Sequence, residues 1–137
     1  MNSEAKIAYF SMEIGLSNDI PTYSGGLGVL AGDTIKSGAD LKIPLVAVTL
    51  LSKKGYFRQD IDNNGRQIEY PILWEPSRFM VLQSKKVKVH IDGRNVYVCA
   101  WRFKVKSVTG GEVDVYYLDT DIEENTQEDR DITAVLY

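Results

Sequence analysis

A nearly continuous apolar run at residues 45–51 constrains the fold of this chain more than any other feature of its sequence. The run reads LVAVTLL, and Pro44 directly before it ends a segment with helical spacing. Apolar, β-branched runs of this kind are typical of parallel strands buried on both faces, whereas strands of antiparallel sheets usually alternate apolar and polar residues. The sequence therefore predicts an α/β fold with a strand at residues 45–51 that is covered on both faces.

Two further elements are predicted before this strand. Residues 6–10 (KIAYF) form a short apolar run that fits a buried strand. Between residues 26 and 41, apolar residues recur at spacings of three and four, which places them on one face of a helix. These residues are Leu27, Leu30, Ala31, Ile35 and Ala39. The order strand, helix, strand predicts a βαβ unit.

Turn signals divide the second half of the chain into antiparallel hairpins. Asn63-Asn64-Gly65 separates residues 56–60 from residues 66–70. Asp92-Gly93 and Gly110-Gly111 flank a long strand that begins near Val96. Asn-Gly and Asp-Gly pairs favour hairpins because these residues adopt the positive φ angles of tight turns. The apolar residues of the long strand predict that Cys99 is a core thiol rather than a nucleophile.

The chain has 137 residues, which is the length of one domain. We divide this single domain into a βαβ unit with a glycine loop (1–55), a β-rich excursion (56–118) and an acidic tail (119–137). A helical turn or two is predicted over residues 128–137.

Scarce residue types exclude several kinds of site. One cysteine and one histidine permit neither a disulfide framework nor a zinc site, and a Ser-His-Asp triad would depend on His90 alone. No stretch is long and apolar enough for a membrane helix or a secretory signal. We therefore expect a cytoplasmic protein with no membrane partner.

The net charge of −3 conceals two oppositely charged blocks. Residues 85–106 contain seven basic residues against Asp92, and residues 107–137 contain nine acidic residues against Arg130. Because the lysines alternate with valines, this pattern favours a solvated strand face, and we expect no nucleic-acid partner.

The segment Ser24-Gly25-Gly26-Leu27-Gly28 stands at the start of the predicted helix. Glycines let a ligand approach the backbone closely, and the free N–H groups of a helix's first turn favour an anion such as phosphate. A tight loop that needs positive φ angles explains the same glycines equally well.

Other patterns in the sequence are weaker. Residues 26–31 match the dinucleotide fingerprint G-x-G-x-x-A, but residues 11–25 separate them from the predicted strand. Asp60-x-Asp62-x-Asn64-Gly65 matches half of a calcium loop, yet Pro71 stands where a bidentate glutamate is needed. Spacing selects no glycosidase-like pair among the available acids. These acids are Glu13, Asp33, Asp60 and Glu69.

Seven short motifs stand in order along nearly the whole chain. They are Ala8-Tyr9-Phe10-Ser11-Met12-Glu13, Tyr23-Ser24-Gly25-Gly26-Leu27-Gly28-Val29-Leu30-Ala31-Gly32-Asp33, Lys36-Ser37, Ala39-Asp40-Leu41, Ile43-Pro44-Leu45-Val46, Gly55-Tyr56-Phe57-Arg58-Gln59 and Leu118-Asp119-Thr120-Asp121. Together they resemble the amino-terminal part of the α-glucan (glycogen or maltodextrin) phosphorylases. Val29 stands where the animal and plant enzymes have arginine, so the chain resembles the shorter bacterial and archaeal branch.

This resemblance implies a two-lobed glycosyltransferase of the B type, in which this chain begins a Rossmann-like lobe (βαβ) followed by antiparallel β hairpins. It implies transfer of a glucosyl unit from an α-1,4-glucan to phosphate, giving glucose 1-phosphate with retention. The implied cofactor is pyridoxal 5′-phosphate, held by a lysine from a later region of the family. None of Lys36, Lys53 and Lys54 matches the family's cofactor-lysine motif, so we expect the chain alone to bind no cofactor and to be inactive.

Carried over by motif, the resemblance places Gly25, Gly26 and Leu27 at the substrate phosphate or glucosyl site, with Gly28 allowing the helix to start. It places Tyr9 near the cofactor and assigns no catalytic residue in this chain. The implied partners are the glucan, phosphate or glucose 1-phosphate and a carboxy-terminal lobe, and a piece without that lobe is expected to self-associate.

Two other functions stay open. A starch or glycogen synthase shares the implied fold, but that family usually shows a lysine just before the glycines, where this chain has Tyr23-Ser24. A non-catalytic module that binds an anion or sugar at Gly25–Gly28, with its charged blocks mediating assembly, is the alternative of a different class.

Overall fold

The computed structural model of the chain describes residues 7–137, so Lys6 of the first predicted strand lies outside the described residues. The elements follow the predicted order of strand, helix, strand and hairpins. They are β1 (Ile7–Phe10), α1 (Gly26–Asp40), β2 (Leu45–Leu50), β3 (Arg58–Ile61), β4 (Gln67–Tyr70), η1 (Pro76–Arg78), β5 (Val81–Leu82), β6 (Val87–Ile91), β7 (Arg94–Lys106), β8 (Glu112–Asp119), α2 (Gln127–Arg130) and η2 (Asp131–Thr133).

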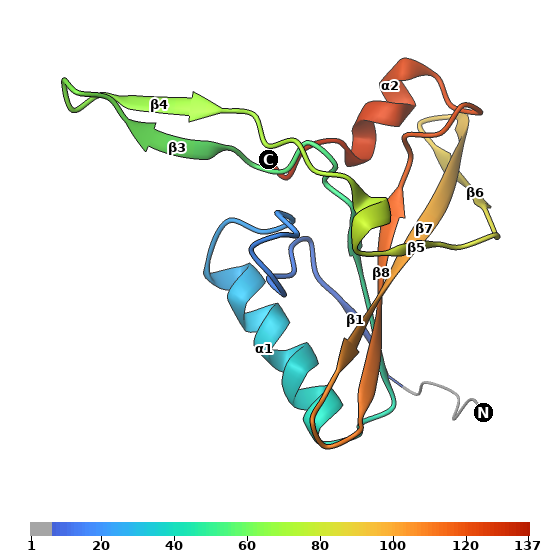
Figure 1. The fold of residues 1–137 in the computed structure, drawn as a ribbon. Helices are drawn as coiled ribbons and strands as arrows, with labels where there is room; N and C mark the ends of the chain where they lie inside the picture. The colour runs from blue at the N-terminus through green and yellow to red at the C-terminus, as the bar shows by residue number, and fades with distance from the viewer. Residues whose placement is uncertain (1–6) are drawn as a thin grey trace.

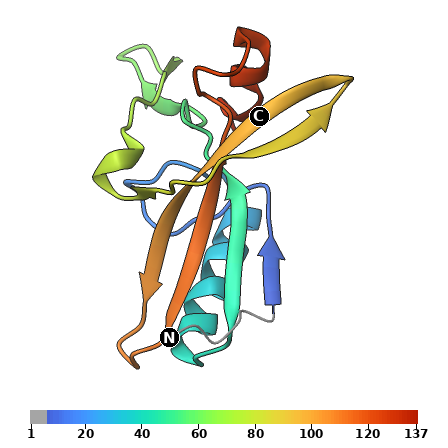
Figure 2. The same ribbon diagram turned by 90° about the vertical axis from the view of Figure 1, so that its right-hand side faces the viewer.

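A mixed sheet of six strands forms the body of the molecule (Figure 2). β2 lies between β1 and β8 and is parallel to both of them. β7 pairs antiparallel with β8, and β5 and β6 both pair with β7. The strand predicted at residues 45–51 is therefore present as β2, which ends at Leu50 and has a parallel neighbour on each side.

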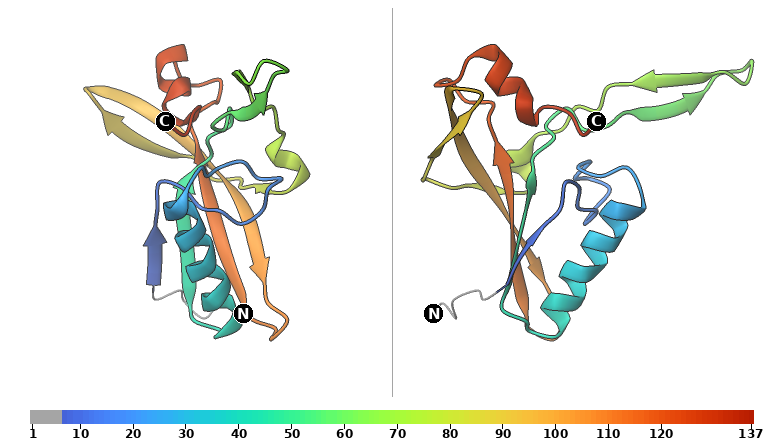
Figure 3. Two further views of the ribbon diagram at one scale, coloured as in Figure 1. Left: turned by 90° about the vertical axis from the view of Figure 1, so that its left-hand side faces the viewer. Right: turned by 180° about the vertical axis from the view of Figure 1, so that it is seen from behind.

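Helix α1 covers one face of this sheet (Figures 1 and 3). The predicted buried face is wrong for two residues, because Leu27 and Leu30 are 47% and 61% exposed. Small residues occupy most of the buried face in their place, and they bring the helix close to its neighbours. The buried residues of α1 are Gly28, Ala31, Gly32, Ile35, Gly38 and Ala39.

The segment between β1 and α1 packs directly on two glycines of the helix. A Cβ atom added at Gly32 would lie 1.9 Å from the carbonyl oxygen of Gly15. A Cβ atom at Gly28 would lie 2.5 Å from the Cβ of Tyr23. The amide of Gly15 also donates a hydrogen bond to the carbonyl of Gly28 (2.8 Å). This close approach explains why glycine occupies both helix positions.

The predicted burial of β2 on both faces is wrong for the residues described. Leu45, Ala47 and Thr49 are buried beneath α1, but Val46 and Val48 are half-buried and Leu50 is exposed. α1 packs on only one face, and the described chain provides no second helix layer on the opposite face.

The predicted hairpins are present, and they differ in their surroundings. β3 and β4 pair on either side of the Asn-Gly turn, where Gly65 has a φ of +76°. Every residue of these two strands is exposed, and the hairpin projects away from the body (Figures 1 and 3). The hairpin β6–β7 turns at Asp92-Gly93, and β7–β8 turns at Gly110-Gly111.

Cys99 on β7 is a buried, free thiol, as predicted. Burial raises its pKa to about 11, so the thiol is protonated at neutral pH and is no nucleophile.

The helical turn or two predicted within residues 128–137 is confirmed by α2 and η2. Helical structure runs from α2 through η2 and ends at Thr133. The last residues bond instead to the loop after β2, with the amide of Lys54 donating to Ala134 and that of Leu136 to Gly55. These non-local bonds compete with continuation of the helix.

The basic and acidic blocks neutralise each other within the chain. Lys86 pairs with Glu124, and Lys104 pairs with Glu112 across β7 and β8. Arg94 pairs with Asp129, which is buried. Within the described residues, these pairs neutralise part of the charge of both blocks. Less unpaired charge is then left to mediate assembly than the sequence indicates.

None of the helices described is both long enough and apolar enough to cross a membrane.

Replacing Gly32 by alanine tests the close approach of α1 to Gly15. The added methyl group would overlap a backbone oxygen, so we expect Gly32→Ala to lower the free energy of unfolding by about 1–3 kcal/mol in urea titrations. Gly26→Ala is the control, because a Cβ there meets no atom within 4 Å. Equal stability of the two variants would contradict the account.

The pairing of Arg94 with Asp129 predicts a pH dependence. Hydrogen bonds from Arg94 lower the pKa of Asp129, so this contact stabilises the fold fully above the unfolded-state pKa of about 3.9. The stabilisation is lost as the pH falls through the lower folded-state value. We expect Asp129→Asn to reduce the stability difference between pH 7 and pH 3, measured by urea unfolding. The exposed Asp33→Asn variant is the control and should retain the wild-type difference.

Candidate functional site

The glycine loop Ser24–Gly28 lies at the start of α1, where its first residues are exposed. Gly25 is the N-cap residue and has extended backbone angles (φ −145°), with no side chain capping the helix. None of the loop's glycines has a positive φ angle. The explanation by left-handed backbone geometry is therefore wrong for this loop.

The loop glycines serve two different purposes. Gly28 is buried and needs to be small because Tyr23 packs against it. At Gly25 and Gly26, an added Cβ would meet nothing within 4 Å. Packing within the described chain thus does not require glycine at these two positions, whereas close approach of a ligand to the backbone would.

The carboxylate of Glu13 holds the loop in place. Its Oε2 atom accepts hydrogen bonds from the amides of Ser24 (2.6 Å) and Gly25 (3.4 Å), and the side chain is 2% exposed. Its Oε1 atom accepts a bond from the hydroxyl of Tyr137 (2.9 Å). This bond to Glu13 raises the pKa of Tyr137. One buried carboxylate therefore joins the loop to the far end of the chain.

Helix α1 leaves backbone donors free at its N-terminus. The amide of Val29 makes the first helical bond, to the carbonyl of Gly25 (3.2 Å). Among the residues described, none accepts a hydrogen bond from the amides of Gly26, Leu27 or Gly28. These N–H groups lie at the positive end of the helix dipole and can donate to a phosphoryl or hydroxyl oxygen.

Three of the described lysines, Lys53, Lys86 and Lys104, do not fit a cofactor held as a Schiff base. Such a lysine needs a depressed pKa. Hydrogen bonds to Asp121, Glu124 and Glu112 respectively raise the pKa of Lys53, Lys86 and Lys104. Tyr9 lies on β1, half-buried against the core beneath α1.

The calcium-like pattern is a hairpin tip. Asp62 accepts hydrogen bonds from the amides of Asn64 and Arg66 (both 2.8 Å), and Asp60 accepts one from Ile61 (2.9 Å). In residues 7–137, no three His, Cys, Asp or Glu side chains are grouped to hold a metal ion.

The four candidate acids have different surroundings. Glu13 is buried beside the loop, and Asp33 is exposed on α1. Asp60 and Glu69 lie on the projecting β3–β4 hairpin. The structure thus gives only Glu13 a contact with the glycine loop. Sequence spacing did not single it out, because its partners are eleven and more residues away.

Comparison with known proteins identifies close relatives of the chain. It is 43% identical over 141 residues to the maltodextrin phosphorylase of Thermococcus litoralis, in an alignment covering 98% of the chain and 16% of that protein. It is 43% identical over 136 residues to the glycogen phosphorylase of Mycobacterium tuberculosis, with 96% of the chain and 16% of that protein aligned. It is 34% identical over 138 residues to the glycogen phosphorylase of Aquifex aeolicus, with 96% of the chain and 19% of that protein aligned. Nearly the whole chain is thus similar to an amino-terminal part of glycogen and maltodextrin phosphorylases.

This finding confirms the resemblance stated from the sequence motifs. The chain spans only 16–19% of the length of these three phosphorylases. No model of a protein family matches it.

Removal of the Glu13 carboxylate tests its structural role. Glu13→Ala leaves the amides of Ser24 and Gly25 without their charged acceptor, so we expect a loss of about 2–3 kcal/mol in the free energy of unfolding. Tyr137→Phe removes only the phenol bond and should cost about 1 kcal/mol. Chemical denaturation measures both values, and equal losses would contradict the loop-holding role of Glu13.

Proposed function

We propose that the chain supplies the amino-terminal part of the catalytic cleft of an α-glucan phosphorylase. The whole enzyme transfers a glucosyl unit from an α-1,4-glucan to phosphate and so gives glucose 1-phosphate. The observation that carries this proposal is the similarity of nearly the whole chain to glycogen and maltodextrin phosphorylases. The chain alone is inactive in this proposal, because it lacks the region that carries the cofactor lysine.

In this proposal, the glycine loop binds the substrate phosphate or the glucosyl unit through its backbone. The amides of Gly26 and Leu27 donate to ligand oxygens, Gly25 leaves room for them, and Gly28 lets the helix start beside Tyr23. Two observations support this role: the open space at Gly25 and Gly26, and the free donors at the start of α1.

The cofactor of the whole enzyme is pyridoxal 5′-phosphate, which supplies a phosphate group for proton transfer with the substrate phosphate. Its lysine comes from outside this chain, in keeping with the raised pKa values of Lys53, Lys86 and Lys104. Tyr9 lies near the cofactor in the assembled cleft.

The chain begins a Rossmann-like lobe, and the rest of the enzyme covers the open face of its sheet. Parallel strands are normally covered on both faces, yet Phe10 is 73% exposed and Leu50 37% exposed. In this proposal, residue 55 ends the βαβ unit and residue 118 ends the β-rich excursion, and both boundaries lie within this part of the lobe. Without its carboxy-terminal lobe, the chain self-associates through the open face. We place the enzyme in the cytoplasm.

Activity assays test the proposal at two levels. The chain alone should release no glucose 1-phosphate from maltoheptaose and phosphate, whereas the protein extended through the cofactor-lysine region should release it. In the extended protein, Gly26→Ala places a methyl group beside the proposed site and should raise the KM for phosphate or glucan about tenfold or more. Ser37→Ala, on the exposed last turn of α1, is the control.

Two results would contradict the proposal. The first is glucose 1-phosphate formation by residues 1–137 alone, and the second is an unchanged kcat and KM in Gly26→Ala.

A further inference from the structure

The buried carboxylate of Glu13 has different partners on its two oxygens. Oε2 accepts the amides of Ser24 and Gly25, whereas Oε1 accepts only the hydroxyl of Tyr137 (2.9 Å) among the residues described. Because the Glu13 side chain is 2% exposed, loss of that hydroxyl would leave Oε1 buried without a partner, and an unpaired buried oxygen costs free energy. The direction in which the carboxylate points therefore depends on Tyr137.

The other oxygen of Glu13 lies against the glycine loop at two places. Oε2 is 2.6 Å from the amide of Ser24, just before α1. A Cβ atom added at Gly28, inside the first turn, would lie 3.0 Å from the same oxygen. The free amides of Gly26 and Leu27 lie between these two contacts along the chain. A rotation of the carboxylate would therefore change the direction in which these free N–H groups point.

Tyr137 reaches Glu13 from a segment that is itself held in place. Two backbone hydrogen bonds (2.7 and 3.2 Å) join residues 134–136 to residues 54–55, in the loop after β2. Leu136, the neighbour of Tyr137, is buried. The ring of Tyr137 meets that of Tyr56 edge to face, with 6.2 Å between the centroids and 88° between the planes. This is a favoured geometry for two aromatic rings, so the hydroxyl is presented to Glu13 from a fixed position.

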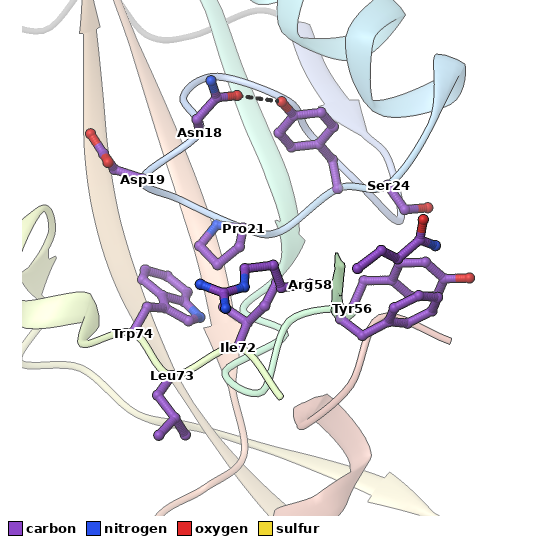
Figure 4. Close-up of a pocket in the computed structure, with 12 residues that line it drawn as sticks. Asn18, Asp19, Pro21, Ser24, Tyr56, Arg58, Ile72, Leu73 and Trp74 are labelled. Atoms are coloured by element: carbon purple, nitrogen blue, oxygen red, sulfur yellow. Dashed lines mark hydrogen bonds between the residues drawn. The ribbon is translucent and has the colours of Figure 1, made fainter. Parts of the chain in front are cut away.

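The hydroxyl and the ring of Tyr137 have separate partners. Tyr56, which the ring contacts, lines a pocket of about 660 Å³ together with Ser24 of the glycine loop (Figure 4). Three segments form the wall of this pocket, with Tyr56 at one end and Trp74 at the other. The hydroxyl instead bonds to Glu13. Replacement by phenylalanine thus removes the contact with Glu13 and keeps the contact with the pocket wall.

We propose that Tyr137 is a positioning residue for phosphate binding, whose hydroxyl orients Glu13 and so aims the free amides of Gly26 and Leu27 at the phosphate. The inference rests on the proposed function for the identity of this anion. Tyr137 itself touches no reacting atom. Its loss weakens binding of phosphate before and during the reaction alike, so the effect falls on the KM for phosphate and not on kcat.

Kinetics on the extended protein test this role. Tyr137→Phe should raise the KM for phosphate about three- to tenfold, with kcat changed by less than about twofold and the KM for maltoheptaose unchanged. A Tyr137 that only stabilised the fold would instead lower kcat by reducing the amount of folded enzyme, with no change in KM. Tyr70→Phe is the matched control, because it removes the hydroxyl of an exposed tyrosine on the projecting β3–β4 hairpin.

A double-mutant cycle tests whether Tyr137 acts through Glu13. In the Glu13→Ala background, Tyr137→Phe should raise the KM for phosphate no further, because the hydroxyl no longer has the carboxylate to orient. Backbone NMR of residues 1–137 provides a second measurement that needs neither activity nor a folded Glu13→Ala variant. Tyr137→Phe should shift the amides of Ser24 and Gly25 without ligand and should weaken the binding of inorganic phosphate by about the same factor as the KM.

The outcomes separate this role from the proposed function. An active Tyr137→Phe enzyme with an unchanged KM for phosphate would overturn the positioning role and leave the function intact. An increase in KM that is equally large in the Glu13→Ala background would overturn it too. An extended protein without phosphorylase activity would overturn the function. NMR then decides the positioning role: weaker phosphate binding in Tyr137→Phe than in the wild type supports it, and equal or absent binding overturns it.

Discussion

The buried carboxylate of Glu13 is the contact on which the candidate site depends. It accepts backbone hydrogen bonds from Ser24 and Gly25, so it holds the loop just before α1 and leaves the first amides of the helix itself free. It also accepts the hydroxyl of Tyr137, which ties the last residue of the chain to the loop. A negative charge at this end of a helix is favourable because it meets the positive end of the dipole. The negative charge of Glu13 would repel a phosphate dianion placed directly beside it. A bound phosphate would therefore accept hydrogen bonds from the free amides of the first helical turn.

Close packing around this carboxylate determines where the loop can bind a ligand. Gly15 and Gly32 touch through backbone atoms, and Gly28 touches Tyr23, so these positions are closed. Gly26 faces open space. The loop thus combines a rigid, tightly packed side with an open side, and such pre-organisation lowers the cost of ligand binding.

Local sequence patterns predicted much of the fold, and long-range contacts account for the rest. The central strand, the helix and the hairpins follow from apolar spacing and Asn-Gly or Asp-Gly turns, which act over a few residues. Exposure of Leu27 and Leu30 was missed because the helix packs through glycine and alanine, which carry little hydrophobic signal. The open face of β2 was not predicted, because an apolar run indicates that a strand can be buried but does not show which elements cover it.

The candidate site, like the fold, was predicted from the sequence only in part. The glycine loop is visible as a motif, but the role of Glu13 depends on partners far away in sequence, and so do the ion pairs Lys86–Glu124 and Arg94–Asp129. The pocket with Tyr56 and Trp74 joins three separate segments, and no spacing rule connects them.

Backbone NMR during a titration with glucose 1-phosphate tests the central claim most directly, because it observes each amide of the loop separately. The account predicts saturable shifts that are largest for the amides of Gly26, Leu27 and Gly28, with small changes at the lysines in and just before β6, which are Lys85, Lys86 and Lys88. Shifts that concentrate on those lysines, or loop amides that stay unmoved at saturating ligand, would contradict the assignment of the glycine loop as the substrate-binding site.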